Sequence, residues 1–267
     1  MSDLRSVELD LIERLEPYAL QCPDDDFDWD TWVLVSDFLV RAASWCQASV
    51  AGPDDGFEPA IFNTFKALAK TAAAEVGRLD GDVRSALLDV VRRARADDSS
   101  VAPWLADYLI GADTPELVAT VHRAGSWLER TLAVLDERDF DRYVIDNRLQ
   151  WDHPAGGLRL RGAVDLVEEG SSRPVVVFPS VDDSRLEQAG YLSLVHGLSQ
   201  KGAAPSVLVV SHSTGSVASY DRGELAERAI GATERAVAAV LARGGEPLGL
   251  ERRPSYFTCQ DCHWFDT

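Results

Sequence analysis

The pattern of apolar residues changes near residue 140, and this change constrains the fold more than any other feature of the chain. Before it, apolar residues recur every three or four positions, as in helices, whereas after it short β-branched runs alternate with turn-rich separators. The elements expected after residue 140 are, in order, strands 143–151, 158–167 and 174–178, helix 185–200, strands 206–211 and 217–220, and helix 224–243. This order predicts an α/β fold with a mixed central sheet, preceded by a helical region.

The first half of the chain is predicted to be helical throughout. The expected helices lie at about 6–20, 31–49, 59–78, 82–95, 101–110 and 114–138. A length of 267 residues suits one large domain or a core with a helical appendage. We therefore divide the chain into a helical region, 1–140, and an α/β core, 141–267.

The charge balance is strongly acidic. The chain has 44 acidic and 26 basic residues, a formal net charge of −18, and only three lysines, Lys66, Lys70 and Lys201. Such a surface is typical of proteins in molar salt, where the Debye length falls to roughly 3 Å and self-repulsion is screened. The alternative is an acidic protein from a high-GC organism. Either origin argues against general affinity for phosphate, although a local patch of arginines (Arg159, Arg161, Arg173, Arg252 and Arg253) remains a candidate for one.

The sequence has no run of about 20 apolar residues and no basic-then-apolar leader, so we expect a cytoplasmic protein without a membrane partner. In a reducing compartment, metal binding is a more common role for cysteines than disulfides are. The chain has four: Cys22, Cys46, Cys259 and Cys262.

Four motifs occur in a fixed order along these elements. They are Gly162-Ala163-Val164-Asp165 in a strand, the strand 174–178 with Pro179-Ser180 after it, Glu187-Gln188-Ala189-Gly190-Tyr191 in a helix, and Tyr18-Ala19-Leu20-Gln21-Cys22-Pro23 with a distant Cys259-Gln260-Asp261-Cys262. Together they resemble the RecB-like branch of the PD-(D/E)XK nuclease superfamily, which includes exonucleases of CRISPR adaptation. The resemblance covers the strand-rich half and both ends of the chain, and implies a restriction-endonuclease-like core.

The resemblance makes Asp165 a metal ligand, but the neighbouring positions do not complete the site. Val177 and Pro179 stand where the family has an acid and a lysine, and neither ligates Mg²⁺ or polarises water. Nuclease chemistry is therefore expected to be lost, with Asp165 as a remnant or simply a solvated or capping carboxylate. The alternative is a divergent active nuclease in which Asp182, Asp183 or Glu187 supplies the missing ligand and Lys201 or an arginine the cation. Asp182 and Asp183 also suit the N-terminus of helix 185–200.

The cysteines resemble the staple that holds an iron–sulfur cluster in this family. Cys22, Cys259 and Cys262 fit three ligand positions, with Cys46 or His263 as a possible fourth, a set that would suit zinc as well as iron. Otherwise C-x-x-C is left over from a lost cluster, and Cys22 and Cys46 are small buried residues.

A rival motif follows strand 206–211. Ser211-His212-Ser213-Thr214-Gly215 resembles the G-x-S-x-G elbow of α/β-hydrolases, with Ser213 as nucleophile and Asp221 or Asp261 and His263 as partners. The simpler interpretation is a polar hairpin turn.

Three functions follow, in decreasing order of support. The first is an inactive nuclease-family protein that acts as a nucleic-acid-processing accessory or a protein-binding module, with DNA or a protein of a DNA-processing complex as its partner. The second is an active DNA exonuclease or endonuclease that depends on Mg²⁺ or Mn²⁺. The third is a serine hydrolase.

Overall fold

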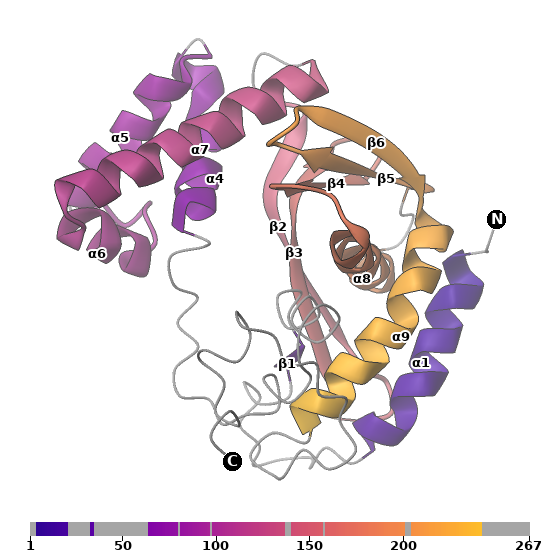
Figure 1. Ribbon diagram of the computed structural model, residues 1–267. Helices are drawn as coiled ribbons and strands as arrows, with labels where there is room; N and C mark the ends of the chain where they lie inside the picture. The colour runs from indigo at the N-terminus through magenta and orange to yellow at the C-terminus, as the bar shows by residue number, and fades with distance from the viewer. Residues whose placement is uncertain are drawn as a thin grey trace.

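The computed structural model describes residues 4–20, 33–34, 64–79, 81–96, 98–136, 140–156, 158–200 and 204–241. Its centre is a mixed β-sheet (Figure 1). The strands are β1 (Val33–Leu34), β2 (Tyr143–Asp152), β3 (Arg159–Glu168), β4 (Arg173–Phe178), β5 (Ser206–Ser211) and β6 (Ser216–Asp221). Together with the helices that cover it, this sheet confirms the predicted α/β fold.

The strands after residue 140 follow the predicted order. β2, β3 and β4 form an antiparallel meander, and helix α8 (Asp183–Ser199) then carries the chain to β5, which pairs parallel with β4. β6 folds back on β5 as an antiparallel hairpin and leads into α9 (Arg222–Leu241). Because α8 crosses from β4 to a parallel neighbour, the sheet is mixed.

β3 is the centre of this arrangement, because three strands pair with it. β2 pairs along its length, whereas β1 pairs with its first two residues and β4 with its last three. The prediction of a helix at 31–49 is therefore wrong at Val33 and Leu34, where pairing with the edge of β3 overrides the helical spacing. The rest of that segment lies outside the described residues.

Two groups of helices cover opposite faces of the sheet (Figure 1). α1 (Leu4–Ala19), α8 and α9 share one core cluster with the sheet, and the other contains α4 (Thr64–Val76), α5 (Val83–Arg95), α6 (Pro103–Gly111) and α7 (Thr114–Leu135). The short 3-10 helix η1 (Gly77–Leu79) continues α4. None of these helices is long and apolar enough to cross a bilayer.

Alternate residues of strand β4 contribute to the two core clusters on opposite faces of the sheet. Val175 and Val177 pack against the α4–α7 group, and Val176 and Phe178 pack on the opposite face, as the two-residue period of a strand requires. All four side chains are buried, which explains why this strand reads as a continuous apolar run.

The helical region does not form one body. α1 buries Val7, Leu11 and Leu15, at the predicted helical spacing, in the cluster of α8 and α9, while α4–α7 lie across the sheet. The division of the chain at residue 140 stays a prediction, but its two parts share both cores.

Gly190 sets the distance between α8 and α9. A Cβ at this position would overlap the carbonyl oxygen of Leu225 and lie 2.9 Å from the Cβ of Ala229. Gly190→Ala is therefore expected to lower the free energy of unfolding by about 1–3 kcal/mol, measured by denaturant titration. The control is Gly125→Ala in α7, where the nearest atom is Leu87 Cδ1 at 3.4 Å, and where stability should rise by about 1 kcal/mol at most. Equal stability of the Gly190 variant and the wild type would contradict close packing of the two helices.

Candidate functional site

Asp165 is a buried carboxylate at the point where β3 and β4 stop pairing. The ladder between these strands runs from Glu168–Arg173 to Leu166–Val175. Beyond the end of the ladder, the Val177 N–H donates to Asp165 Oδ2 at 2.6 Å, so a side chain accepts the hydrogen bond in place of a backbone carbonyl. Only 1 % of Asp165 is exposed, which excludes the interpretation of a solvated carboxylate.

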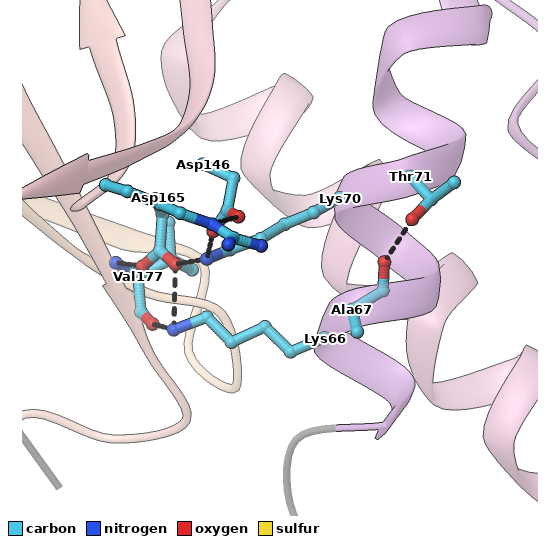
Figure 2. A network of polar contacts seen from close by, with 8 residues as sticks. Lys66, Ala67, Lys70, Thr71, Asp146, Asp165 and Val177 are labelled. Atoms are coloured by element: carbon cyan, nitrogen blue, oxygen red, sulfur yellow. Dashed lines mark hydrogen bonds and ion pairs between the residues drawn. The ribbon is translucent and has the colours of Figure 1, made fainter. Parts of the chain in front are cut away.

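Two lysines from α4 hold the other oxygen of Asp165 (Figure 2). Lys66 and Lys70 lie one helical turn apart, and their Nζ atoms are 2.9 Å and 3.1 Å from Asp165 Oδ1. Lys66 also donates to the Val177 carbonyl oxygen at 3.1 Å. The lysines therefore join α4 to both β3 and β4.

Asp146 on β2 completes the network, at an irregular point of the strand. Its ladder neighbours pair as Ile145–Leu166 and Asn147–Val164, which places Asp146 opposite Asp165. Its φ of 52° is left-handed, a conformation that aspartate tolerates better than most residues but that still costs about 1 kcal/mol. Lys70 Nζ lies 2.6 Å from Asp146 Oδ1, so one ammonium bridges two carboxylates.

Burial and ion pairing act in opposite directions on these groups. Burial alone would raise the pKa of Asp165, but the charges of Lys66 and Lys70 outweigh it and the pKa lies below its ordinary value. Burial would lower the pKa of Lys70, but Asp165 and Asp146 outweigh it and the pKa is raised. Both groups therefore stay charged at neutral pH.

A cavity of about 510 Å³ opens beside this network. It lies between α4, α6, β2, β3, β4 and α8, and its polar or aromatic lining includes Lys66, Lys70, Trp104, Arg148, Asp165 and Gln188. Gln188 is 5 % exposed and accepts a hydrogen bond of 2.8 Å from Arg185. It belongs to the motif at residues 187–191, whose Tyr191 hydroxyl donates to the Arg161 carbonyl oxygen at 2.7 Å.

Of the positions expected around Asp165, the structure brings Val177 to it and places the substitute acids elsewhere. Asp182 caps α8 by accepting from the Arg185 N–H at 2.9 Å, which confirms its predicted capping role. Asp183 forms an ion pair with Arg228 at 3.3 Å, and Glu187 lies on α8. None of these three acidic residues lines the cavity. Their role as substitute ligands stays a prediction.

The predicted metal site lies outside the described residues, because Cys22, Cys46, Cys259, Cys262 and His263 all do, as does Lys201. Among the residues that the structure describes, no group of three or more histidine, cysteine, aspartate or glutamate side chains is placed to hold a metal ion.

Ser213 lies in the turn of the β5–β6 hairpin, which confirms the simpler interpretation of that motif. The nucleophile elbow requires a strand that turns into a helix, whereas β5 turns into the antiparallel strand β6, with Gly215 at φ 66°. Ser213 Oγ donates to the Pro179 carbonyl oxygen. Asp221 accepts from the Glu224 N–H at 3.1 Å near the start of α9, and Asp261 lies outside the described residues.

Three of the five arginines in the suggested patch interact with neighbouring strand side chains. Arg159 lies 2.5 Å from Asp152, Arg161 donates to Gln150 at 3.3 Å, and Arg173 lies 2.9 Å from Glu168. Arg252 and Arg253 lie outside the described residues. The described part of the patch is therefore largely engaged within the protein.

A second buried polar cluster lies on the opposite side of the sheet. Arg222 at the start of α9 is 0 % exposed and donates to Ser193 Oγ at 2.9 Å, the Ala204 carbonyl at 3.3 Å and His196 Nδ1 at 3.0 Å. Burial lowers the pKa of Arg222 to about 10, although Glu8 on α1 opposes the shift. Burial and the charge of Arg222 together lower the pKa of His196 to about 4, so His196 is neutral.

The residues that sequence reasoning missed are Lys66, Lys70, Asp146, Trp104 and Arg148. A usable signal was present for the two lysines, because they make up two of the three lysines in the chain and are spaced four residues apart in a predicted helix. Their partners were not predictable, since local spacing does not show which strand a helix packs against.

No protein-family model matches the chain, and a search of curated proteins found no significant match. Function therefore has to be inferred from the geometry around Asp165.

Proposed function

We propose that this protein is a non-catalytic relative of the RecB-like PD-(D/E)XK nucleases that acts as a nucleic-acid-processing accessory or as a protein-binding module. The order of three antiparallel strands, a helix and a parallel strand supports the proposal, because Asp165, Val177 and α8 occur in the order that the resemblance implies. An iron–sulfur cluster or zinc on the cysteines remains part of the proposal.

The observation that carries the proposal is the state of Asp165. Nuclease chemistry needs a Mg²⁺ ion with near-octahedral oxygen ligands and a bound water. Here Lys66 and Lys70 supply the positive charge, and the Val177 N–H occupies the second carboxylate oxygen. A metal would have to displace the Lys70 ammonium from its carboxylate partners, and this ammonium, on a side chain only 14 % exposed, would be left uncompensated.

One observation favours the alternative of an active metal-dependent nuclease. Asp146 and Asp165 both contact Lys70, so two carboxylates lie on either side of one cation. If Lys70 moved out, this pair would offer oxygen ligands to Mn²⁺. Asp146 is then a better candidate for the second ligand than Asp182, Asp183 or Glu187.

Incubation with Mn²⁺ distinguishes the two functions. We expect no cleavage of end-labelled single- or double-stranded DNA, in dilute buffer or in molar KCl, because the Lys66 and Lys70 ammoniums lie on Asp165 Oδ1, where a metal ion and its water would have to bind. In a parallel titration, the wild type and the Asp165→Asn variant should bind Mn²⁺ equally, because Asp165 is not expected to be a ligand. Asp183→Asn is the control, since the Asp183 side chain is 90 % exposed.

Cleavage that Asp165→Asn or Asp146→Asn abolishes and Asp183→Asn preserves would contradict the proposal and establish an active nuclease. Cleavage that is the same in all variants would identify a contaminating enzyme. Asparagine is chosen because its amide oxygen still accepts from the Val177 N–H.

A further inference from the structure

We propose that the cavity beside Asp165 binds a mononucleotide, with its phosphate on Lys70 and Arg148 and its base against Trp104. This inference rests on the proposed function, because it assigns a ligand to the same site. It requires a local positive charge, free donors and an exposed aromatic ring in one cavity.

The charge of the cavity differs from that of the protein. Lys66, Lys70 and Arg148 face Asp146 and Asp165, so three positive and two negative side chains give a formal charge of +1. The whole chain carries −18, and two of its three lysines line this one cavity. An anion is therefore attracted here and repelled by most of the acidic surface.

Lys70 and Arg148 both retain hydrogen-bond donors. The Lys70 ammonium has three N–H groups and contacts two carboxylate oxygens, at 2.6 Å and 3.1 Å, so one N–H remains. The Arg148 side chain is 87 % exposed, and the ion pair that the structure shows for it joins Nε to Asp146 Oδ2 at 3.6 Å. Its terminal nitrogens are thus placed to form the paired hydrogen bonds that guanidinium makes with phosphate.

Trp104 supplies the aromatic surface. It lies at the start of α6, lines the cavity, and is 52 % exposed, the only aromatic residue among the large apolar side chains that the described part of the chain exposes. Trp127 on α7, by contrast, is 0 % exposed and belongs to the core. An exposed indole beside cationic side chains is the arrangement on which nucleobases stack.

The size of the cavity supports a small ligand. About 510 Å³ lies within the range of roughly 300–1,000 Å³ found for small-molecule sites. Buried residues of β4 and α8, among them Phe178, Gln188 and Leu192, line one side of the cavity, which is otherwise partly open to solvent. A cavity of this volume suits a single nucleotide, whereas a continuous strand needs a groove that extends beyond it.

Isothermal titration of the full chain with 5′-AMP in the presence of EDTA tests the inference. We expect saturable 1:1 binding, with adenosine and inorganic phosphate each binding at least about tenfold more weakly. Arg148→Gln and Trp104→Ala should each weaken AMP binding about tenfold or more. Both residues are largely exposed, so the variants should fold.

Two matched controls lie outside the cavity. Arg78→Gln removes an arginine that is 79 % exposed with one acidic partner, and Ile110→Ala removes a 59 % exposed apolar residue from the same helix as Trp104. Both should bind AMP within about twofold of the wild type.

Absence of AMP binding, or equal losses in the controls, would overturn the inference. The inference would also be overturned, in favour of a nucleic-acid strand, if the protein bound a single-stranded oligonucleotide but not AMP and if Arg148→Gln and Trp104→Ala weakened that binding. AMP binding together with Asp165-dependent cleavage would preserve the ligand and refute only the non-catalytic function.

Discussion

Asp165→Ala is expected to lower the free energy of unfolding by about 3–5 kcal/mol, the usual effect of removing one partner from a buried ion pair. The variant leaves two ammoniums without their shared carboxylate and the Val177 N–H without its acceptor. Lys70 keeps its ion pair with Asp146, but its side chain is 14 % exposed and cannot readily replace Asp165 with water. Denaturant unfolding at a fixed salt concentration measures the change.

The triple variant Asp165→Ala, Lys66→Met, Lys70→Met shows whether the loss comes from uncompensated charge. Replacing Asp165 and both lysines with apolar side chains should restore much of the stability, because the remaining member of the network, Asp146, is 36 % exposed and can be solvated. Asp183→Ala, which removes a 90 % exposed carboxylate, should change stability by less than about 0.5 kcal/mol. If alanine at position 165 destabilises the Lys66→Met, Lys70→Met background as much as the wild type, the network is not held by charge.

Acidification from pH 6.5 to about pH 4 is expected to remove up to about 3 kcal/mol of stability through His196 alone. Its pKa is lowered from 6.5 to about 4 in the folded protein, so the unfolded chain takes up a proton in this interval before the folded protein does. The contribution is fully present above pH 6.5 and is lost as the pH falls. Urea unfolding at half-unit pH steps measures it.

The lowered pKa of His196 has two physical causes: burial, which disfavours the charged imidazolium, and then the positive charge of Arg222 beside it. Arg222 donates to Nδ1 at 3.0 Å, and Glu8 is the acidic group that acts on Arg222. His196→Asn keeps an acceptor near the Nδ1 position but does not titrate. The free energy of unfolding of this variant should therefore fall less steeply between pH 6.5 and pH 4 than that of the wild type. His122→Asn, on the exposed face of α7, serves as the control and should keep the wild-type slope. A wild-type slope in His196→Asn would show that other groups cause the acid sensitivity.

The strands between residues 143 and 221 were predictable because their signals are local. β4 is a run of buried valines between turn-forming residues, and the β5–β6 connection contains Gly215 in a left-handed turn. Turn chemistry and apolar period depend only on neighbouring residues, so the order of elements was readable in advance. The same holds for the position of Asp165 on β3.

The sequence did not show in the same way which helices cover which face of the sheet. The apolar stripes of α1 and α4 show that each helix packs on something, but not that they lie on opposite faces. Val33 and Leu34 lie in a segment with helical spacing and become a strand because an edge of β3 is available to them. Near Asp165 the strand period itself breaks, since Val164 and Val167 share one core cluster and Leu166 belongs to the other.

By itself, the sequence determined the α/β class, the order of the strands, and the position of Asp165 on β3. Only the tertiary structure decided what neutralises Asp165: Lys66 and Lys70, which precede it by 99 and 95 residues in the chain, both form ion pairs with its carboxylate. The physical reason is that an ion pair depends on how a helix docks against a sheet. That docking is set by the shapes of two packed apolar surfaces, whereas the spacing of residues along the chain shows only that each surface exists.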